Sequence, residues 1–226
     1  MARIPRAAVG DMVYHVINRS NGRLTIFKEE NDYKAFERIL EEAKEKYSMR
    51  ILSYCIMPNH WHFIMYPKKG EDLANFIRWV TLTHTQRWHV KNKTVGEGHL
   101  YQGRYKSFPI QKDEYFLQAC RYVERNPLRA KLVKKAEDWR WSSLWINVRG
   151  NNQQKKLLSN WPLEKPKDYL SWINIPQENE KEHLKKVRYS IKRNRPFGKN
   201  SWIVKTAKSL GLNSTLKPRG RPKKGT

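Results

Sequence analysis

The sequence predicts an α+β domain: a ferredoxin-like split β-α-β core, an antiparallel sheet with helices on one face, and a C-terminal helical and basic extension. Three observations predict this class. Short β-branched and aromatic runs alternate with longer segments whose apolar residues recur at helical spacing. The break at Pro58-Asn59 makes two strands neighbours in a hairpin. The expected order β-α-β-β-α-β-α is that of the ferredoxin-like fold.

The first five elements follow from local pattern. The run MVYHVINRS predicts a strand that ends at the turn signal SNG. Two later segments keep apolar residues on one helical face, and the second of them opens with two acidic residues, as a helix N-terminus favours. The expected elements are a strand at 12–20, a helix at 29–47, hairpin strands at 50–57 and 60–67, and a helix at 71–92.

The remaining elements divide the chain into three parts. Alternation predicts a strand at 100–110, and apolar spacing predicts a helix at 113–126 that Pro127 ends, which completes a compact α+β core domain at 1–135. Residues 136–180 are expected to be a linker with one short helix in DWRWSSLWINVRG, a flexible loop at NNQQKK and irregular structure around its prolines. Residues 181–226 are expected to be a basic tail, with one helix capped by Ser201 and stopped by Gly211.

Composition indicates a cytoplasmic protein. The 226 residues suffice for one hydrophobic core without disulfides, and Cys55 and Cys120 both sit in apolar surroundings typical of buried thiols in a reducing compartment. The N-terminus has no apolar signal segment, and no uncharged run approaches the roughly 20 residues of a membrane helix. We therefore expect no membrane association, and a nucleoid location if DNA is the partner.

The positive charge is large and uneven. The formal net charge is +25, and residues 181–226 hold 15 lysines and arginines against one acidic residue. Such a field attracts a polyanion through counterion release, and nine Trp with eleven Tyr offer flat surfaces on which unpaired bases stack. Nucleic acid is the expected partner; a merely solvated surface and an anionic membrane are the alternatives.

The stretch SYCIMPNHWHFIMYP places His60 and His62 two residues apart in a strand. Side chains at i and i+2 of a strand share a face, so the two imidazoles project together and Trp61 points the opposite way. Two imidazoles on a rigid strand can hold a transition metal and leave positions open for other ligands. Two partly exposed histidines without a metal are the alternative interpretation.

The helix CRYVERNP carries a second candidate. Tyr122 and Asn126 are four residues apart and share one face of the helix. Beside a divalent cation, a phenol can attack a phosphate and form a covalent phosphotyrosine. The alternative is a core tyrosine and an asparagine C-cap. Tyr115 opens the same helix, and spacing alone does not choose between the two tyrosines.

Basic residues mark the predicted DNA contacts. The segment GHLYQGRYKSFPI interleaves cations and rings, which suits a nucleic-acid backbone with splayed bases, although an edge strand also carries cations to prevent edge pairing. The tail segment PRGRP looks like the core of an AT-hook for a narrow A·T minor groove, or acts as an unselective basic tail. The predicted contacts are Arg104, Tyr105, Lys106, Arg121, Arg125, Arg219 and Arg221.

Together these motifs resemble the HUH-class single-tyrosine transposases, specifically the REP-associated tyrosine transposases. MPNHWHFIMYP, GHLYQGRYKS and YVERNPLRAKLV occur in the order of that family, and the likeness continues through DWRWSS to the tail. The resemblance implies a ferredoxin-like core that cuts and rejoins hairpin-bearing single-stranded DNA, such as REP-like palindromes, through a 5′-phosphotyrosine. It also implies Mg²⁺ or Mn²⁺ as cofactor, and a monomer or a homodimer.

Residue by residue, the resemblance assigns His60 and His62 to the metal and Tyr122 to the nucleophile. Asn126 stands where relatives present a Gln or Asn, as a third metal contact, and Tyr115 becomes the less favoured nucleophile. Two other functions stay open. One is a DNA-binding regulator with a vestigial site. The other is a metal hydrolase that activates water, but the β-hairpin at 50–67 that carries the histidines contains no acidic residue to act as general base.

Overall fold

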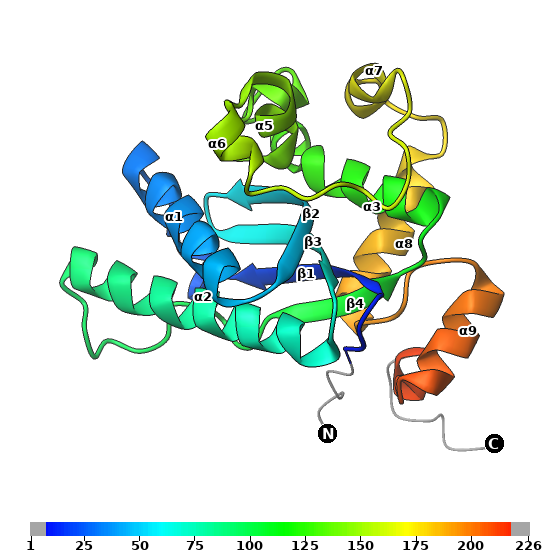
Figure 1. Ribbon diagram of the computed structural model, residues 1–226, viewed down its shortest axis with the longest axis horizontal. Coiled ribbons are helices and arrows are strands. Elements are labelled where there is room, and N and C mark those ends of the chain that lie inside the picture. The colour runs from blue at the N-terminus through cyan, green and yellow to red at the C-terminus, as the bar shows by residue number, and fades with distance from the viewer. Residues whose placement is uncertain (1–7, 218–226) are drawn as a thin grey trace, which may run out of the picture.

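The computed structural model describes residues 8–217, and a four-stranded sheet with the order β2-β3-β1-β4 forms its centre (Figure 1). Every neighbouring pair of strands is antiparallel. This order is the one that two linked split β-α-β units produce, so the predicted α+β, ferredoxin-like class is confirmed. The strands are β1 (Val13–Arg19), β2 (Met49–Met57), β3 (His60–Pro67) and β4 (Lys106–Ile110).

Two long helices, α1 (Glu30–Lys46) and α2 (Gly70–Asn92), cover one face of the sheet and lie toward the left in Figure 1. The Asp32 carboxylate starts α1 because it accepts hydrogen bonds from the backbone N–H groups of Lys28 and Glu29. The core between these helices and the sheet is aromatic, with Trp61 fully buried among phenylalanines. Apolar side chains therefore fill the space between this face of the sheet and the two helices.

The opposite face is covered by α3 (Glu114–Glu124) and α8 (Glu180–Arg193). The prediction of helices on one face is thus correct for α1 and α2 and wrong for α3. The strands contain the reason: β2 is apolar at nearly every position, and its residues divide between two separate apolar clusters, one on each face. A strand that is buried on both sides loses simple alternation.

The C-terminal half wraps around this core with short helices. The segment before α5 pairs with β2, where the N–H of Ile56 donates to the carbonyl of Trp141 at 2.9 Å. The segment expected to be a flexible loop contains α6, and the segment expected to be irregular contains α7. The helices are α4 (Asn126–Arg129), α5 (Ser143–Arg149), α6 (Asn152–Lys155), α7 (Tyr169–Asn174) and α9 (Asn200–Ser209).

The predicted start of a basic tail at residue 181 does not coincide with a structural boundary. Val187 of α8 is buried in the apolar cluster of α3, and Phe197 exchanges backbone hydrogen bonds of 2.9 Å with Pro109 and Gln111 at the end of β4. In the sequence of α8, many lysines and arginines surround a short apolar stripe, and this stripe packs the helix against the sheet. The extension is therefore part of the core up to Phe197.

Three boundaries differ from expectation. The predicted strand at 100–110 is a loop until Lys106, because Tyr101 turns inward and its hydroxyl accepts a 3.0 Å hydrogen bond from Trp61 Nε1. Pro127 lies inside α4 rather than after the last helical residue. Ser201 lies inside α9, whose N-cap is Lys199, whereas Gly211 follows that helix with a φ of 65° as expected. Across residues 8–217, no helix is long and apolar enough to span a bilayer.

Candidate catalytic cleft

The strand β3 presents its two histidines as the i, i+2 spacing predicts. His60 and His62 face α3, while Trp61 is fully buried on the opposite face. Their rings lie 5.1 Å apart, centroid to centroid. His62 is opposite Cys55 on one neighbouring strand and Ile17 on the other, so it occupies the middle of the sheet. Backbone pairing on both sides thus fixes where the imidazole points.

Both imidazoles are neutral near pH 7 because burial opposes their charge. Burial, and then the nearby Arg19, lower the pKa of His60 to about 4. Burial lowers the pKa of His62 well below its ordinary value, and His15 and His60 lower it further. His60 Nδ1 lies 2.6 Å from Asn59 Oδ1, so this nitrogen donates and Nε2 keeps its lone pair. A neutral imidazole with a free lone pair is the form that binds metals.

A third histidine, His15 of β1, belongs to the site and was not predicted from the sequence. Its Nε2 lies 2.8 Å from His62 Nδ1, and the two rings stack with centroids 5.0 Å apart. The sequence does contain one indication of this residue, because His15 interrupts an otherwise apolar strand. Its closeness to His62, however, follows only from the register that pairs β1 with β3.

The helix α3 brings Tyr122 to the histidines. Asp113 starts the helix by accepting a 3.0 Å hydrogen bond from the N–H of Tyr115, and two turns later the Tyr122 ring lies 5.7 Å from that of His62 and 5.9 Å from that of His15. Tyr115 instead packs against Phe197, 5.2 Å between ring centroids, in a different cavity. The structure therefore places Tyr122, and not Tyr115, beside the predicted metal ligands.

Asn126 lines the same cleft, but its amide is engaged. Its Oδ1 accepts a 2.8 Å hydrogen bond from Arg129, and its Nδ2 donates to the carbonyl of Val123 at 3.2 Å. Arg129 also donates to the carbonyl of Tyr122 and holds its guanidinium 4.5 Å from the centroid of the Tyr122 ring. Burial lowers the pKa of Arg129 to about 10, so it stays charged near neutral pH. Arg129 thus links Tyr122 and Asn126 of the YVERNP motif, a role that its sequence position did not suggest.

These residues enclose a cleft of about 450 Å³ at the ends of β1 and β3. Arg19 comes from β1, Lys106 from β4, and two exposed cations, Arg188 and Lys192, from α8. Among the described residues that line the cleft, none is acidic. Its full lining is Ile17, Arg19, Met57, His60, His62, Lys106, Tyr122, Asn126, Arg129, Ala130, Arg188, Ile191 and Lys192. The cleft is therefore shaped and charged for an anion.

The donor set fits a divalent cation that an anion helps to bind. His60 and His62 supply two imidazoles on one face, and an amide oxygen is near. Within residues 8–217, no group of three His, Cys, Asp or Glu side chains has metal-binding geometry. Since Mg²⁺ and Mn²⁺ favour oxygen ligands, a phosphate oxygen is the natural further ligand, and its charge would offset that of the surrounding lysines and arginines.

Two predicted DNA contacts, Arg121 and Arg125, are buried instead. Arg125 Nε lies 3.1 Å from the Glu180 carboxylate, and Arg121 Nη1 lies 3.8 Å from it. Arg121 also donates to the carbonyls of Trp172 and Ile175, at 2.9 and 2.7 Å, and Arg125 donates to that of Ile173. Both guanidiniums connect α3 to the α7–α8 segment, so in this structure they are not accessible to DNA. The structure therefore corrects the prediction that these two residues contact DNA. The sequence did not reveal their partner, because Glu180 is more than fifty residues away.

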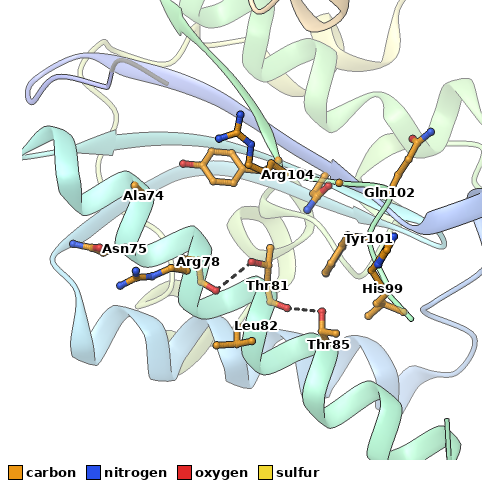
Figure 2. A pocket seen from close by; sticks show the side chains of 14 residues that line it. Ala74, Asn75, Arg78, Thr81, Leu82, Thr85, His99, Tyr101, Gln102 and Arg104 are labelled. Carbon is orange, nitrogen blue, oxygen red and sulfur yellow. Dashed lines mark hydrogen bonds between the residues drawn. The ribbon is translucent and has the colours of Figure 1, made fainter. Parts of the chain in front are cut away.

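The other predicted contacts are divided between two sites. Lys106 lines the catalytic cleft, whereas Arg104 and Tyr105 line a separate groove of about 830 Å³ between α2 and the loop before β4. Figure 2 shows this groove, with Arg78, Thr81 and Leu82 on α2 opposite the loop that carries His99, Gln102 and Arg104. Tyr105 is buried, so it forms part of the wall rather than an exposed stacking surface. Arg219 and Arg221 lie outside the described residues.

Comparison with known proteins gives the family. The family model described as "Transposase IS200 like" matches residues 8–126, which include all four strands, the histidine pair and Tyr122. A protein of Haemophilus influenzae, named provisionally as a REP-associated tyrosine transposase, is 22% identical over 122 residues, covering 50% of this chain and 69% of that protein.

A solved structure of a REP-associated tyrosine transposase bound to a REP hairpin shares the fold. Its TM-score is 0.56 at 17% sequence identity, and the match covers 79% of this chain and 96% of the other. The resemblance predicted from the motifs is therefore confirmed. Because the family model spans more than half of the 226 residues, this chain belongs to the IS200-like transposase family.

Proposed function

We propose that this chain cuts and rejoins hairpin-bearing single-stranded DNA through a covalent 5′-phosphotyrosine at Tyr122. The observation that carries the proposal is the meeting of Tyr122 with His62, 5.7 Å between ring centroids, in a cleft lined by cations. Family membership and the relative that binds a REP hairpin support the choice of substrate. That this chain acts on a DNA hairpin is part of the proposal, and REP-like palindromes are the proposed class of hairpin.

In the proposed step, the Tyr122 oxygen forms a bond to phosphorus as the bond from phosphorus to the 3′ oxygen breaks. The phenolic proton is lost and the 3′ oxygen gains one, so a free 3′-hydroxyl results. Arg188 and Lys192 bind the DNA backbone, and Arg129 holds the Tyr122 ring and Asn126 in place. The exchange keeps one phosphodiester-like bond throughout, so the reverse step rejoins the strands.

His60 and His62, with Asn126 if Arg129 releases its amide, would hold Mg²⁺ or Mn²⁺. Such a cation would stabilise the charge that develops on the scissile phosphate. The tyrosine and the histidines of one chain meet, which supports a monomer as the active form, with a homodimer as the alternative.

Covalent adduct formation tests the proposal. The native protein, incubated with hairpin-bearing single-stranded DNA and Mn²⁺, should give a protein–DNA band that survives denaturing electrophoresis. Tyr122→Phe should abolish that band, because the ring stays and only the nucleophilic oxygen is lost. Tyr115→Phe is the matched control and should leave adduct formation unchanged. An adduct that persists in Tyr122→Phe would remove this residue from the proposed role.

A DNA-binding regulator without cleavage is the second candidate. The observation that favours it is the Asn126 amide oxygen, which is bonded to Arg129 rather than exposed to a cation. This function predicts salt-dependent hairpin binding and no adduct in any metal. A hydrolase that activates water is less well supported, because none of the described residues lining the cleft is an acidic general base.

A further inference from the structure

His15 lies beneath His62 on the neighbouring strand and does not line the cleft. It is 1% exposed, and burial of this depth keeps an imidazole ring neutral near pH 7. Its Nε2 lies 2.8 Å from His62 Nδ1. Since both rings are neutral, one of these nitrogens donates a proton to the other, and the direction decides the tautomer of both rings.

The two directions have different consequences for the cleft. If His15 donates, His62 carries its own proton on Nε2 and has no lone pair to offer a cation. If His62 donates from Nδ1, its Nε2 lone pair is free. A partner that fixes the tautomer of a ligating histidine is a common part of metal sites, and its loss weakens metal binding.

We propose that His15 is a positioning residue, whose Nε2 accepts the proton of His62 Nδ1 and so keeps the His62 Nε2 lone pair available to a cation in the cleft. The inference rests on the proposed function, in which His60 and His62 bind a divalent cation. No other described residue contacts His62 Nδ1 by a hydrogen bond. His15 is therefore the group that sets the His62 tautomer.

The companion ligand supports this direction. His60 Nδ1 lies 2.6 Å from Asn59 Oδ1, and the orientation of that amide is fixed by its Nδ2, which donates to the carbonyl of Arg23 at 3.3 Å. An amide oxygen only accepts, so His60 donates from Nδ1 and keeps its lone pair on Nε2. With His15 as acceptor, both histidines offer the same nitrogen.

The charge around the cleft supports the same direction. Arg19 and Arg129 both act on His62 as positive charges, and a positive field favours a lone pair over an N–H directed toward it. This direction costs free energy at His15, because its Nδ1 then carries a proton and is buried without a hydrogen-bond partner among the described residues. In contrast, the buried His84 on the other face has a partner for its Nδ1, the Tyr101 hydroxyl at 2.7 Å. An unpaired buried nitrogen next to a ligand candidate is typical of a functional constraint.

Nitrogen-15 NMR of the metal-free native protein near pH 7 tests the tautomers directly. We expect the shifts of His62 and His15 to show a proton on Nδ1 and a bare Nε2 in each ring. A proton on Nε2 of His62 would overturn the proposal. This measurement needs neither substitution nor activity, so it decides the question even if the His15 variants do not fold.

Metal affinity supplies the second test, with Tyr122→Phe as the background so that bound hairpin DNA is not cleaved. His15→Leu should weaken Mn²⁺ binding to the DNA complex by about 10- to 100-fold. His15→Gln places an amide oxygen close to the original Nε2 and should bind within about threefold of the parent. His84→Leu, the control for loss of a buried histidine, should bind as the parent does.

Three outcomes would contradict the inference. Unchanged Mn²⁺ affinity in His15→Leu would remove His15 from the site while leaving the proposed function intact. Equal losses in His15→Leu and His15→Gln would show that packing, and not hydrogen-bond acceptance, matters. Failure of the parent Tyr122→Phe complex to bind Mn²⁺ at all would overturn the cation itself, and the role of His15 with it.

Discussion

Two groups of arginines and lysines lie around α3, and they differ in where their counter-charge comes from. Arg121 and Arg125 are buried at its C-terminal end against Glu180 and backbone carbonyls. Arg188 and Lys192 project from α8 into the catalytic cleft, where no described lining residue is acidic. The first group has its counter-charge within the protein, whereas the second has no acidic partner among residues 8–217, so a bound anion would supply its counter-charge.

The comparison teaches that position in the fold, and not residue type, decides which cations are paired inside the protein and which line the cleft. All four residues are cations, and the two at the end of α3 are within three residues of Tyr122. Arg121 and Arg125 were predicted as DNA contacts from the sequence, whereas Arg188 and Lys192 were not. Helical geometry directs Arg121 and Arg125 away from Tyr122, toward a carboxylate supplied by a distant segment.

Removing the internal counter-charge should have the largest effect. Glu180→Ala leaves two guanidiniums buried without their carboxylate, and breaking a buried ion pair from one side costs about 3–5 kcal/mol of the free energy of unfolding. Urea denaturation of the full chain measures this. Glu182→Ala, two residues along the same helix, loses an exposed pair with Lys186 and should leave the stability nearly unchanged. Equal effects of the two substitutions would show that Arg121 and Arg125 do not depend on Glu180 for their counter-charge.

Removing a cleft cation should weaken DNA binding without affecting stability. Lys192→Ala is expected to lower hairpin affinity and to reduce the slope of log affinity against log salt by about 1, as for one phosphate contact. Fluorescence anisotropy at several salt concentrations measures both quantities. Lys186→Ala removes the same charge from the same helix, outside the cleft lining, and serves as control. If Lys186→Ala reduces the slope as much as Lys192→Ala, binding follows total charge and not the cleft.

The smallest effect concerns Glu124, a buried carboxylate on α3 between the two arginines. Its oxygens accept hydrogen bonds from Ser143 and Tyr169, both at 2.7 Å, and burial raises its pKa despite these bonds. Because the folded-state pKa is above the unfolded one, the carboxyl stabilises the fold most at low pH, and this contribution is lost as pH rises through the folded-state pKa. Glu124→Gln should remove this dependence and cost about 1 kcal/mol or less at acidic pH.

Urea denaturation of both proteins between pH 4 and pH 8 checks this expectation. The stability of the native protein relative to Glu124→Gln should fall as the pH increases over that range. A relative stability that instead rises with pH would mean that the hydrogen bonds outweigh burial at Glu124.

The sequence determined the elements and the parts of the site that depend on local spacing. Strand and helix periods placed β1 to β3 and α1 to α3 within a few residues, because amphipathic patterns need only near neighbours. The i, i+2 spacing put His60 and His62 on one face for the same reason. The motifs also carried the family resemblance, which the comparisons confirm.

Only the tertiary structure decided the contacts between distant segments. Strand register brings His15 to His62, α3 turns Tyr122 toward the histidines and Tyr115 toward Phe197, and the packing of α8 brings Arg188 and Lys192 to the cleft. The same packing buries Arg121 and Arg125 on Glu180. These contacts join residues tens of positions apart, and their geometry follows from burying two sheet faces at once. Sequence periodicity describes one element at a time, so it contains no information about which elements meet.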